Sequence, residues 1–249
     1  FDDNPEFAGR VFGEPLKPSG LKPLQGLGFG IAGTFTQVSS NAAGLPNNIG
    51  GTLPGYWTAG QQQFFAYNPL AGPVVADGVH WRIAPQMSHY WGPFGLMGEY
   101  SISHQGVYNS TTFRAAELNH TAWNMSGQWV ITGEDATFGP LVPKRPFNFR
   151  SGGWGAWQLV GRYGQLDIDD DAFPAFSNPD LSATSAQSWS VGINWWLNRN
   201  VRIMTSFSYT LFDGGGAPFN PTAPATGTAP NTVVTQPESV FLTRLQLSF

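Results

Sequence analysis

The stretch SVFLTRLQLSF at residues 239–249 decides the fold expected of this chain. Its apolar residues recur at alternate positions, so that Phe241 and Leu247 lie on one face of a strand and Arg244 lies on the other. Such a strand separates an apolar surface from a polar one. An ending of this kind, with Phe249 as the last residue, is typical of the closing strand of a transmembrane β-barrel, and the last strand of a soluble β-sandwich is the alternative.

The composition of the 249 residues favours the barrel, as a single domain over residues 1–249. Only 11% of the residues are charged, against roughly 25% in ordinary soluble domains, while aromatic residues reach 14% and include 10 tryptophans. Apolar and small polar residues are mixed at short range, as a wall with one face in lipid and the other in water requires. No apolar run reaches the roughly 18 residues of a membrane-spanning helix, which excludes that class.

Other features exclude further classes of protein. The chain has no cysteine, so neither disulfides nor thiolate metal sites hold the fold together. The formal net charge is -4 and no run of lysine or arginine exists to neutralise phosphates, so we expect no nucleic-acid partner. The chain begins at Phe1 without the basic and apolar segments of a signal peptide, which predicts a mature or truncated chain.

Turn-forming residues occur too often along the chain for helices of normal length. The segments between them alternate apolar and polar residues, as strands do. Pro85 is a local defect in one of these segments because it lacks a backbone donor. Long loops are expected at 38–60, which is rich in Ser, Asn, Gly and Pro, at 134–153, which is a Pro/Gly connection, and at 213–238, which is rich in Gly, Pro, Thr and Ala. Strands are predicted at residues 5–14, 24–37, 61–68, 77–91, 94–105, 118–133, 155–169, 188–197, 201–212 and 239–249.

Several short motifs, in this order and spacing, resemble those of the phosphate-selective porin O and P family. The motifs are LQGLGFG at 24–30, YWGPFGL at 90–96, GEY at 98–100, PKRPF at 143–147, GAWQLVGRY at 155–163, LDID at 166–169, WSVGINWWLN at 189–198 and VR at 201–202.

The resemblance implies an all-β fold, namely an antiparallel transmembrane β-barrel of the bacterial outer membrane. Members of the family are sixteen-stranded trimeric barrels, whereas 249 residues accommodate nine or ten strands with these loops. The chain is therefore expected to be the C-terminal part of such a porin, without the first portion that would carry the inward-folded constriction loop. A complete ten-stranded barrel is the alternative.

The alternation of long and short connections predicts an orientation in the membrane. If Phe249 lies on the periplasmic side, loop 213–238 is extracellular and the short turn 198–200 is periplasmic. The same counting puts the short turn 91–93 on the periplasmic side. It also puts the long link 134–153 there, which departs from the expected pattern of short periplasmic turns.

Arginines on the polar faces of the strands are the candidate site residues. Each lies among Ser, Thr, Gln, Asn or Gly, and turning it toward lipid would cost about 2–4 kcal/mol at mid-membrane, so we expect it to face the lumen. A guanidinium there suits phosphate or carboxylate oxygens. In the alternative interpretation, each is paired with a carboxylate such as Glu99 or Asp167 and only braces the wall. The candidates are Arg82, Arg162, Arg202 and Arg244, with Arg10 in addition.

No other cluster in the sequence indicates catalysis, a metal or a cofactor. The carboxylates of Asp167 and Asp169–Asp171 are hard oxygen ligands for Ca²⁺ or for cations that bridge lipopolysaccharide, but a solvated loop fits their spacing better. The histidines at 80, 89, 104 and 120 lack metal-ligand spacing, and no Ser/His/Asp arrangement supports a hydrolase.

Three functions are compatible with these features. The first is a porin for passive diffusion of small hydrophilic solutes, either a general one or one with a preference for anions or phosphate. The others are a non-conducting barrel that serves as a structural partner in an envelope assembly, and a soluble, lectin-like sandwich that uses the many tryptophans. For the porin, the expected partners are outer-membrane lipid and lipopolysaccharide, small anions and two further copies of the chain in a homotrimer.

Overall fold

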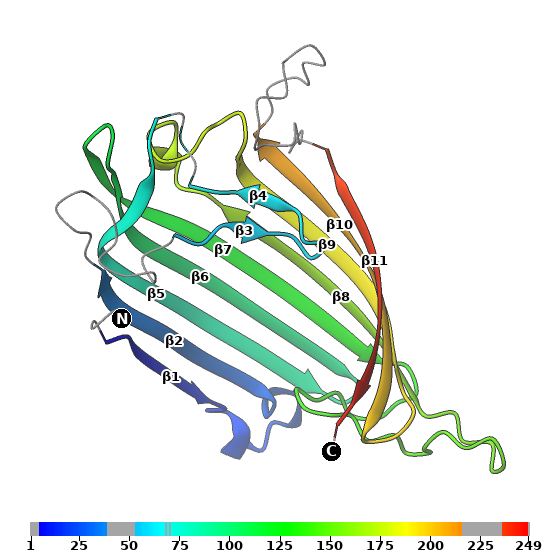
Figure 1. The fold of residues 1–249 in the computed structure, drawn as a ribbon. Helices are drawn as coiled ribbons and strands as arrows, with labels where there is room; N and C mark the ends of the chain where they lie inside the picture. Colours follow the sequence, from blue (N-terminus) through cyan, green and yellow to red (C-terminus); the bar gives the residue numbers. More distant parts are fainter. Residues whose placement is uncertain (1–4, 39–52, 68, 70, 216–235, 249) are drawn as a thin grey trace.

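The computed structural model describes residues 5–38, 53–67, 69, 71–215 and 236–248. Within them the protein is an antiparallel sheet of nine strands, in which each strand lies beside its neighbours in sequence order, with a small hairpin in front of it (Figure 1). The strands of the sheet are β1 (Phe7–Gly13), β2 (Leu27–Val38), β5 (Val74–Trp91), β6 (Phe94–Asn109), β7 (Arg114–Val130), β8 (Ala156–Asp167), β9 (Ala183–Trp196), β10 (Val201–Gly214) and β11 (Glu238–Leu247).

The all-β prediction is confirmed, as one large sheet instead of the two layers of a sandwich. The described helical segments are short 3-10 turns at Lys17–Ser19, Lys22–Leu24 and Asp170–Ala172. None of the helices in the described part of the chain has the length and apolar character needed to cross a membrane. Within the same residues, the edge strands β1 and β11 do not pair with each other.

Strands β5 to β7 are longer than the sequence predicted. Strand β6 continues to Asn109 and β7 begins at Arg114, whereas the prediction ended one strand at 105 and began the next at 118. The additional ladder includes polar residues such as Glu117, which pairs with Gly106. Backbone pairing does not require apolar side chains, so the hairpin extends beyond the apolar part of the wall.

Pro85 has the local effect that its missing donor predicts. Strand β5 pairs Ile83 with Ile102 and next pairs Gln86 with Glu99, so the ladder to β6 is interrupted at Ala84 and Pro85. The register is the same on both sides of the gap, because β2 pairs with β5 throughout this stretch. The proline therefore interrupts one ladder without ending the strand.

The connections divide the sheet into two ends. One end, here called the turn end, carries Gly92-Pro93, the turn at 197–200, the connection 14–26 and the link 131–155. The opposite loop end carries residues 110–113 and 168–182, together with the β2–β5 and β10–β11 connections. The predicted placement of the long link beside the short turns is confirmed. Phe249 lies outside the described residues, so the periplasmic assignment of the turn end remains a prediction.

The two faces of the sheet differ sharply in polarity. The inner face is the one that the small hairpin covers, and it is rich in Ser, Gln, Asn, Gly and Arg. The opposite, outer face carries most of the exposed large apolar side chains, as lipid contact would require. They include Phe29, Ile31, Ile83, Trp91, Phe94, Tyr100, Trp123, Met125, Trp129, Leu159, Tyr163, Trp189, Val191, Ile193, Phe241, Leu245 and Leu247.

A short hairpin of β3 (Tyr56–Trp57) and β4 (Gln63–Phe65) lies across the inner face, in front of β7 to β9 in Figure 1. This corrects one expectation. The predicted loop 38–60 contains β3, while its residues 39–52 lie outside the described residues. The hairpin is also a segment folded onto the inner wall, which the sequence did not predict for this part of the chain. The physical reason is that the aromatic rings of the hairpin bury themselves against the wall.

The main core lies at the loop end, between the hairpin, the inner face and the β8–β9 connection. Phe64 and Phe65 of the hairpin are buried there with Leu118 of β7 and Phe212 of β10. Phe176 of the β8–β9 connection closes this core. The hairpin is thus part of the folded structure and has a fixed position over the wall.

Candidate functional site

The hairpin β3–β4 and the wall beneath it form the candidate site. The hairpin reverses at Thr58–Gln62, where Thr58 N donates to Gln62 O at 2.9 Å and Gln62 N donates to the Thr58 hydroxyl at 3.1 Å. That hydroxyl in turn donates to Glu238 Oε1 of β11 at 2.9 Å. The tip is therefore held at the far edge of the sheet, and the hairpin crosses the inner face (Figure 1).

The base of the hairpin is fixed to β7 through His120. The Tyr67 hydroxyl lies 2.6 Å from His120 Nε2, and Asp169 N donates to His120 Nδ1 at 3.1 Å. Because Nδ1 accepts, the neutral ring carries its proton on Nε2 and donates it to Tyr67. The rings of Tyr56 and Phe65 pack against His120 with centroids 5.6 and 5.5 Å away.

Two neighbouring cavities lie between the hairpin and the wall. The larger, of about 450 Å³, is lined by Trp57, Thr58 and Phe64 from the hairpin and by residues of β6 to β10 from the wall. The smaller, of about 220 Å³, lies beside Tyr56. Three residues of the wall line both cavities, so the two spaces are adjacent; they are Ser101, Ala122 and Leu166.

Arg162 of β8 lines the larger cavity in a surface of hydroxyl groups. The register places Arg162 directly between Ser126 of β7 and Ser190 of β9. The Ser190 hydroxyl lies 2.7 Å from that of Ser208 on β10. A guanidinium among hydroxyls offers several donors to one anion, and the carboxylate expected of a bracing ion pair is not among its neighbours.

Arg82 of β5 lines the smaller cavity together with Tyr56 and Ser103. Ser103 is its direct cross-strand partner on β6, and His120 follows in the same row on β7. Arg82 and Arg162 therefore line adjacent spaces under the hairpin, which the sequence alone did not predict. Tyr56 and Trp57 add aromatic walls to these spaces.

Arg202 and Arg244 form a second group near the turn end. Arg202 Nη2 and Nε donate to Gln246 Oε1 at 2.7 and 3.1 Å, and its guanidinium lies 4.6 Å from the centroid of the Trp196 ring. Arg244 pairs across the strands with Met204, one row from Arg202 on the same face. Amide and aromatic contacts hold Arg202 in place without neutralising its charge.

Arg10 lies on the inner face of the edge strand β1, over the ring of Phe12. Both residues line a cavity of about 620 Å³ that also includes Glu99 and Phe138. The Glu99 carboxylate accepts from Gln86 Nε2 at 2.7 Å. Arg10 is thus separated from the four other arginines and shares its cavity with a carboxylate.

The strands of the described sheet give the inner face an excess of positive charge. They carry six arginines, the five candidates and Arg114 at the loop-end start of β7, and two glutamates, Glu99 and Glu238, on this face, a difference of four charges. Within the described residues, no ion pair joins any of these arginines to a carboxylate. Asp167, the other partner that the sequence suggested, lies on the outer-face register and accepts from Gln165 at 2.7 Å. The bracing interpretation therefore lacks its ion pairs.

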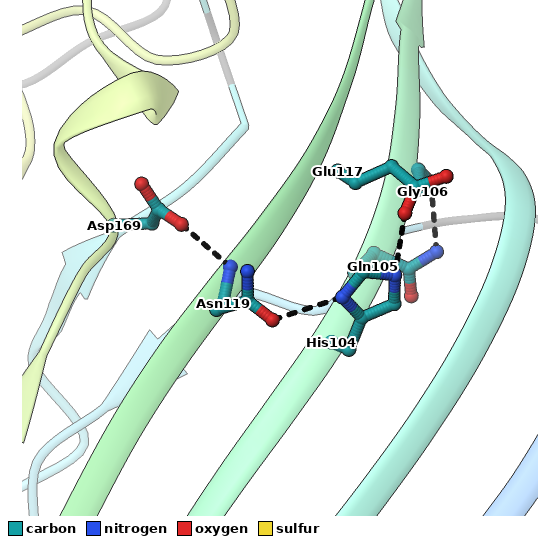
Figure 2. Close-up of polar contacts among 6 residues, drawn as sticks. All are labelled: His104, Gln105, Gly106, Glu117, Asn119 and Asp169. Carbon is teal, nitrogen blue, oxygen red and sulfur yellow. Dashed lines mark hydrogen bonds and ion pairs between the residues drawn. The ribbon is translucent and has the colours of Figure 1, made fainter.

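A separate polar network joins strands at the loop end on the outer-face register. Figure 2 shows the His104 ring between Glu117 and Asn119, with Nε2 3.0 Å from Glu117 Oε2 and Nδ1 2.9 Å from Asn119 Oδ1. The Asn119 backbone N donates to Asp169 Oδ2 at 2.7 Å. These contacts tie β6, β7 and the β8–β9 connection together, and Asp169 joins them to His120 at the base of the hairpin.

The acidic loop after β8 is a structural feature in the residues described. Asp169 caps the short 3-10 helix by accepting from Asp171 N at 3.0 Å. Within the described ranges, His, Asp and Glu side chains form no group of three or more that is placed to hold a metal ion. The side chains of Asp170 and Asp171 are exposed in this loop.

Sequence reasoning missed the residues that fix the hairpin, namely Thr58, Tyr67 and His120. His120 does lie on the predicted polar face of its strand, and the dense aromatic cluster after residue 56 was an available signal. Neither the polar position of His120 nor the aromatic cluster shows which distant residue each side chain contacts. The contact between Tyr67 and His120 spans 53 positions in the sequence.

Comparison with known proteins gives a consistent result. A search of curated proteins gave no match. The model of the family described as phosphate-selective porin O and P matches residues 47–210, which is well over half of the 249 residues. The matched part includes the hairpin and strands β5 to β9. The chain therefore belongs to this family of bacterial outer-membrane porins, which are β-barrel channels and not enzymes.

Proposed function

We propose that this porin conducts small hydrophilic anions, phosphate among them, in preference to cations. The observation that carries the proposal is the inner wall, where six guanidiniums outnumber two carboxylates and form no ion pair in the described residues. Charged side chains that line a pore set the sign of the ions that enter it. The chain as a whole has a net charge of -4, so the preference depends on where the charges lie.

Arg82 and Arg162 are the proposed contacts for the passing anion. They line adjacent cavities, and the hydroxyls of Ser101, Ser103 and Ser190 lie on the same walls. Hydroxyl and guanidinium donors together replace part of the hydration shell of a phosphate. Because each contact remains open to water, the anion is held weakly enough to leave, as conduction requires. No bond is made or broken in the solute.

The hairpin β3–β4 is the proposed constriction. It narrows the space beside Arg162 with the rings of Trp57 and Phe64, so a large solute meets an aromatic barrier. Selection by size and by charge then occurs in the same place.

The test is ion selectivity in planar bilayers. Purified protein should give steady channels whose reversal potential in a KCl gradient favours chloride, and added phosphate should lower the conductance. Arg162→Gln and Arg82→Gln should each reduce the anion preference, because each removes one wall charge. Arg150→Gln, in the exposed link between β7 and β8, removes the same charge outside the inner wall and should change the selectivity little.

Cation-selective current that phosphate does not affect would refute the anion proposal and leave the porin. A purified protein that inserts but never conducts, and that stays bound to another envelope protein, would favour the non-conducting structural barrel.

We also propose that the protein works as a homotrimer in contact with outer-membrane lipid and lipopolysaccharide. The support is the resemblance to trimeric porins and the apolar outer face. Native mass spectrometry from mild detergent should give a mass of three chains, and a monomer across detergents would contradict the trimer.

A further inference from the structure

An ordered projection lies at the turn end, in the link between β7 and β8. We call residues 145–155 the rim finger. Asn148 and Gly153 pair their backbones in both directions, at 3.0 and 3.2 Å, and the Asn148 side chain accepts from Arg150 N at 2.8 Å. Gly152 supplies the left-handed turn with a φ of 70°. In Figure 1 the link projects beyond the sheet at the lower right. Its sequence thus builds a defined turn instead of a loose connection.

The rim finger is attached to the outer side of the wall. Phe147 N donates to Leu197 O at 2.6 Å, and Trp195 Nε1 donates to Trp154 O at 2.8 Å. The Phe147 ring meets that of Trp195 edge to face at 5.0 Å, and Trp195 stacks on Trp157 at 5.1 Å. Trp195 is on the outer-face register of β9, so the rim finger continues the apolar surface at its margin.

The rim finger presents aromatic rings to the surroundings. Phe149 is 90% exposed and Trp154 is 71% exposed, which leaves most of both rings without protein contact. Aromatic residues at such a position are typical of the level where lipid head groups meet hydrocarbon. Exposed rings beside the lipid-facing wall therefore have a membrane surface within reach.

Cations surround these rings. Arg145 and Arg150 belong to the rim finger, and Arg199 lies in the turn that accepts the hydrogen bond from Phe147. All three are exposed, and within the described residues none forms an ion pair with a carboxylate. Guanidiniums with free donors beside an interfacial aromatic cluster suit phosphodiester oxygens.

The two ends of the sheet differ in charge, and the rim finger lies at the more basic end. At the turn end the described residues include six basic side chains and three acidic ones, whereas the loop end is strongly acidic. The basic residues are Lys17, Lys22, Lys144, Arg145, Arg150 and Arg199, and the acidic ones are Glu14, Glu134 and Asp135. Glu14 is paired with Lys17, and Glu134 is buried. Arg145, Arg150 and Arg199, half of these basic residues, therefore give the rim finger and the turn beside it a local excess of positive charge.

We propose that the rim finger, with Arg199, binds the phosphate of anionic glycerophospholipids and anchors this end of the barrel in the leaflet beside it. A second copy of the chain is the competing occupant. Lipid is favoured because the patch combines unpaired cations with exposed aromatic rings at the margin of a lipid-facing wall, the composition of segments that bind anionic membrane surfaces.

The experiment measures lipid retention by native mass spectrometry. Protein is reconstituted with equal amounts of phosphatidylglycerol and phosphatidylcholine and released into mild detergent. The wild type should retain phosphatidylglycerol preferentially. Arg145→Gln combined with Arg150→Gln should lower that preference by about fivefold or more, since each basic residue near an anionic surface attracts it measurably. Arg82→Gln combined with Arg162→Gln, which removes two guanidiniums from the inner wall, should retain the preference.

Each alternative outcome has a distinct signature. Equal retention in the wild type and the Arg145/Arg150 variant would overturn the proposal. Loss of oligomers with unchanged lipid retention would assign the rim finger to a contact between copies. A Phe149→Ser variant should weaken retention of both lipids, because it removes the ring and leaves the charges. The ion selectivity of the Arg145/Arg150 variant and of Phe149→Ser should equal that of the wild type, which separates this test from that of the proposed conduction.

Discussion

At the scale of single residues, the surroundings of each charged group decide what it does. Arg162 lies among hydroxyls on the inner wall, whereas Glu134 at the turn end is buried and fully bonded. The Glu134 carboxylate accepts from the Thr132 hydroxyl and, at 2.9 Å, from Lys144 N. One charge is available to a ligand, and the other holds the β7–β8 link in place.

Glu134 gives the link a dependence on pH. Burial by itself would raise the pKa of Glu134, but the hydrogen bonds from Thr132 and Lys144 and the charge of Lys144 outweigh it and lower that pKa below its ordinary value. The stabilisation is therefore fully present above the unfolded-state pKa of about 4.3 and is lost as the pH falls through the lower folded-state pKa.

Glu134→Gln should destabilise the link near neutral pH by about 1–3 kcal/mol, because hydrogen bonds to a charged acceptor are replaced by weaker ones. Hydrogen exchange of residues 132–145 measures it. The variant should exchange faster than the wild type at neutral pH, and the difference should shrink in acid. Asp135→Asn, next to it and exposed, is the control. Equal exchange at all pH values would contradict a role for the Glu134 carboxylate.

At the scale of elements, the hairpin β3–β4 covers part of the inner wall and encloses two cavities against it. Its position depends on contacts at both ends, Tyr67 with His120 at the base and Thr58 with Glu238 at the tip. Between these contacts Phe64 and Phe65 are buried. Burial of the Phe64 and Phe65 rings supplies most of the free energy that holds the hairpin on the wall. The two hydrogen bonds fix which part of the wall the hairpin covers.

Tyr67→Phe should loosen the base of the hairpin without unfolding the sheet. Loss of one buried hydrogen bond costs about 1–2 kcal/mol, and His120 Nε2 is left without its partner. Single-channel recordings should show larger conductance or more frequent fluctuations. Tyr209→Phe removes a hydroxyl from the outer face and should behave as the wild type does. Recordings of Tyr67→Phe that match the wild type would show that this bond does not restrain the hairpin.

At the scale of the whole molecule, the difference between the two faces places the protein in the membrane. Met125 and Asn124 are neighbours on β7, yet Met125 belongs to the exposed apolar face and Asn124 pairs with Glu99 on the inner wall. A charged side chain at position 125 would therefore face lipid, whereas one at position 124 would face water and the Glu99 carboxylate.

Met125→Arg should lower the free energy of folding into lipid vesicles by about 2–4 kcal/mol, the cost of an arginine near the bilayer midplane. Asn124→Arg should fold nearly as well as the wild type, because its side chain lies beside Glu99 in the lumen. Urea titration of folding into vesicles compares the two. Equal destabilisation of both variants would contradict the assignment of the faces.

Most of the sheet could be predicted from the sequence, because alternation is a local property. Nine of the predicted strands appear in the sheet, and the polar register of all five candidate arginines is as predicted. The tenth, predicted at 61–68, is β4 of the hairpin and lies outside the sheet. The role of the arginines in conduction stays a prediction.

The sequence by itself determined the strands, the two faces and the side chains that point to each, since these follow from a two-residue period. Only the tertiary structure decided where the hairpin lies, which arginines share a space and where the rim finger is attached. These depend on contacts between distant residues, such as Tyr67 with His120 and Phe147 with Leu197. No local pattern encodes such a contact, because it exists only when the sheet has brought the partners together.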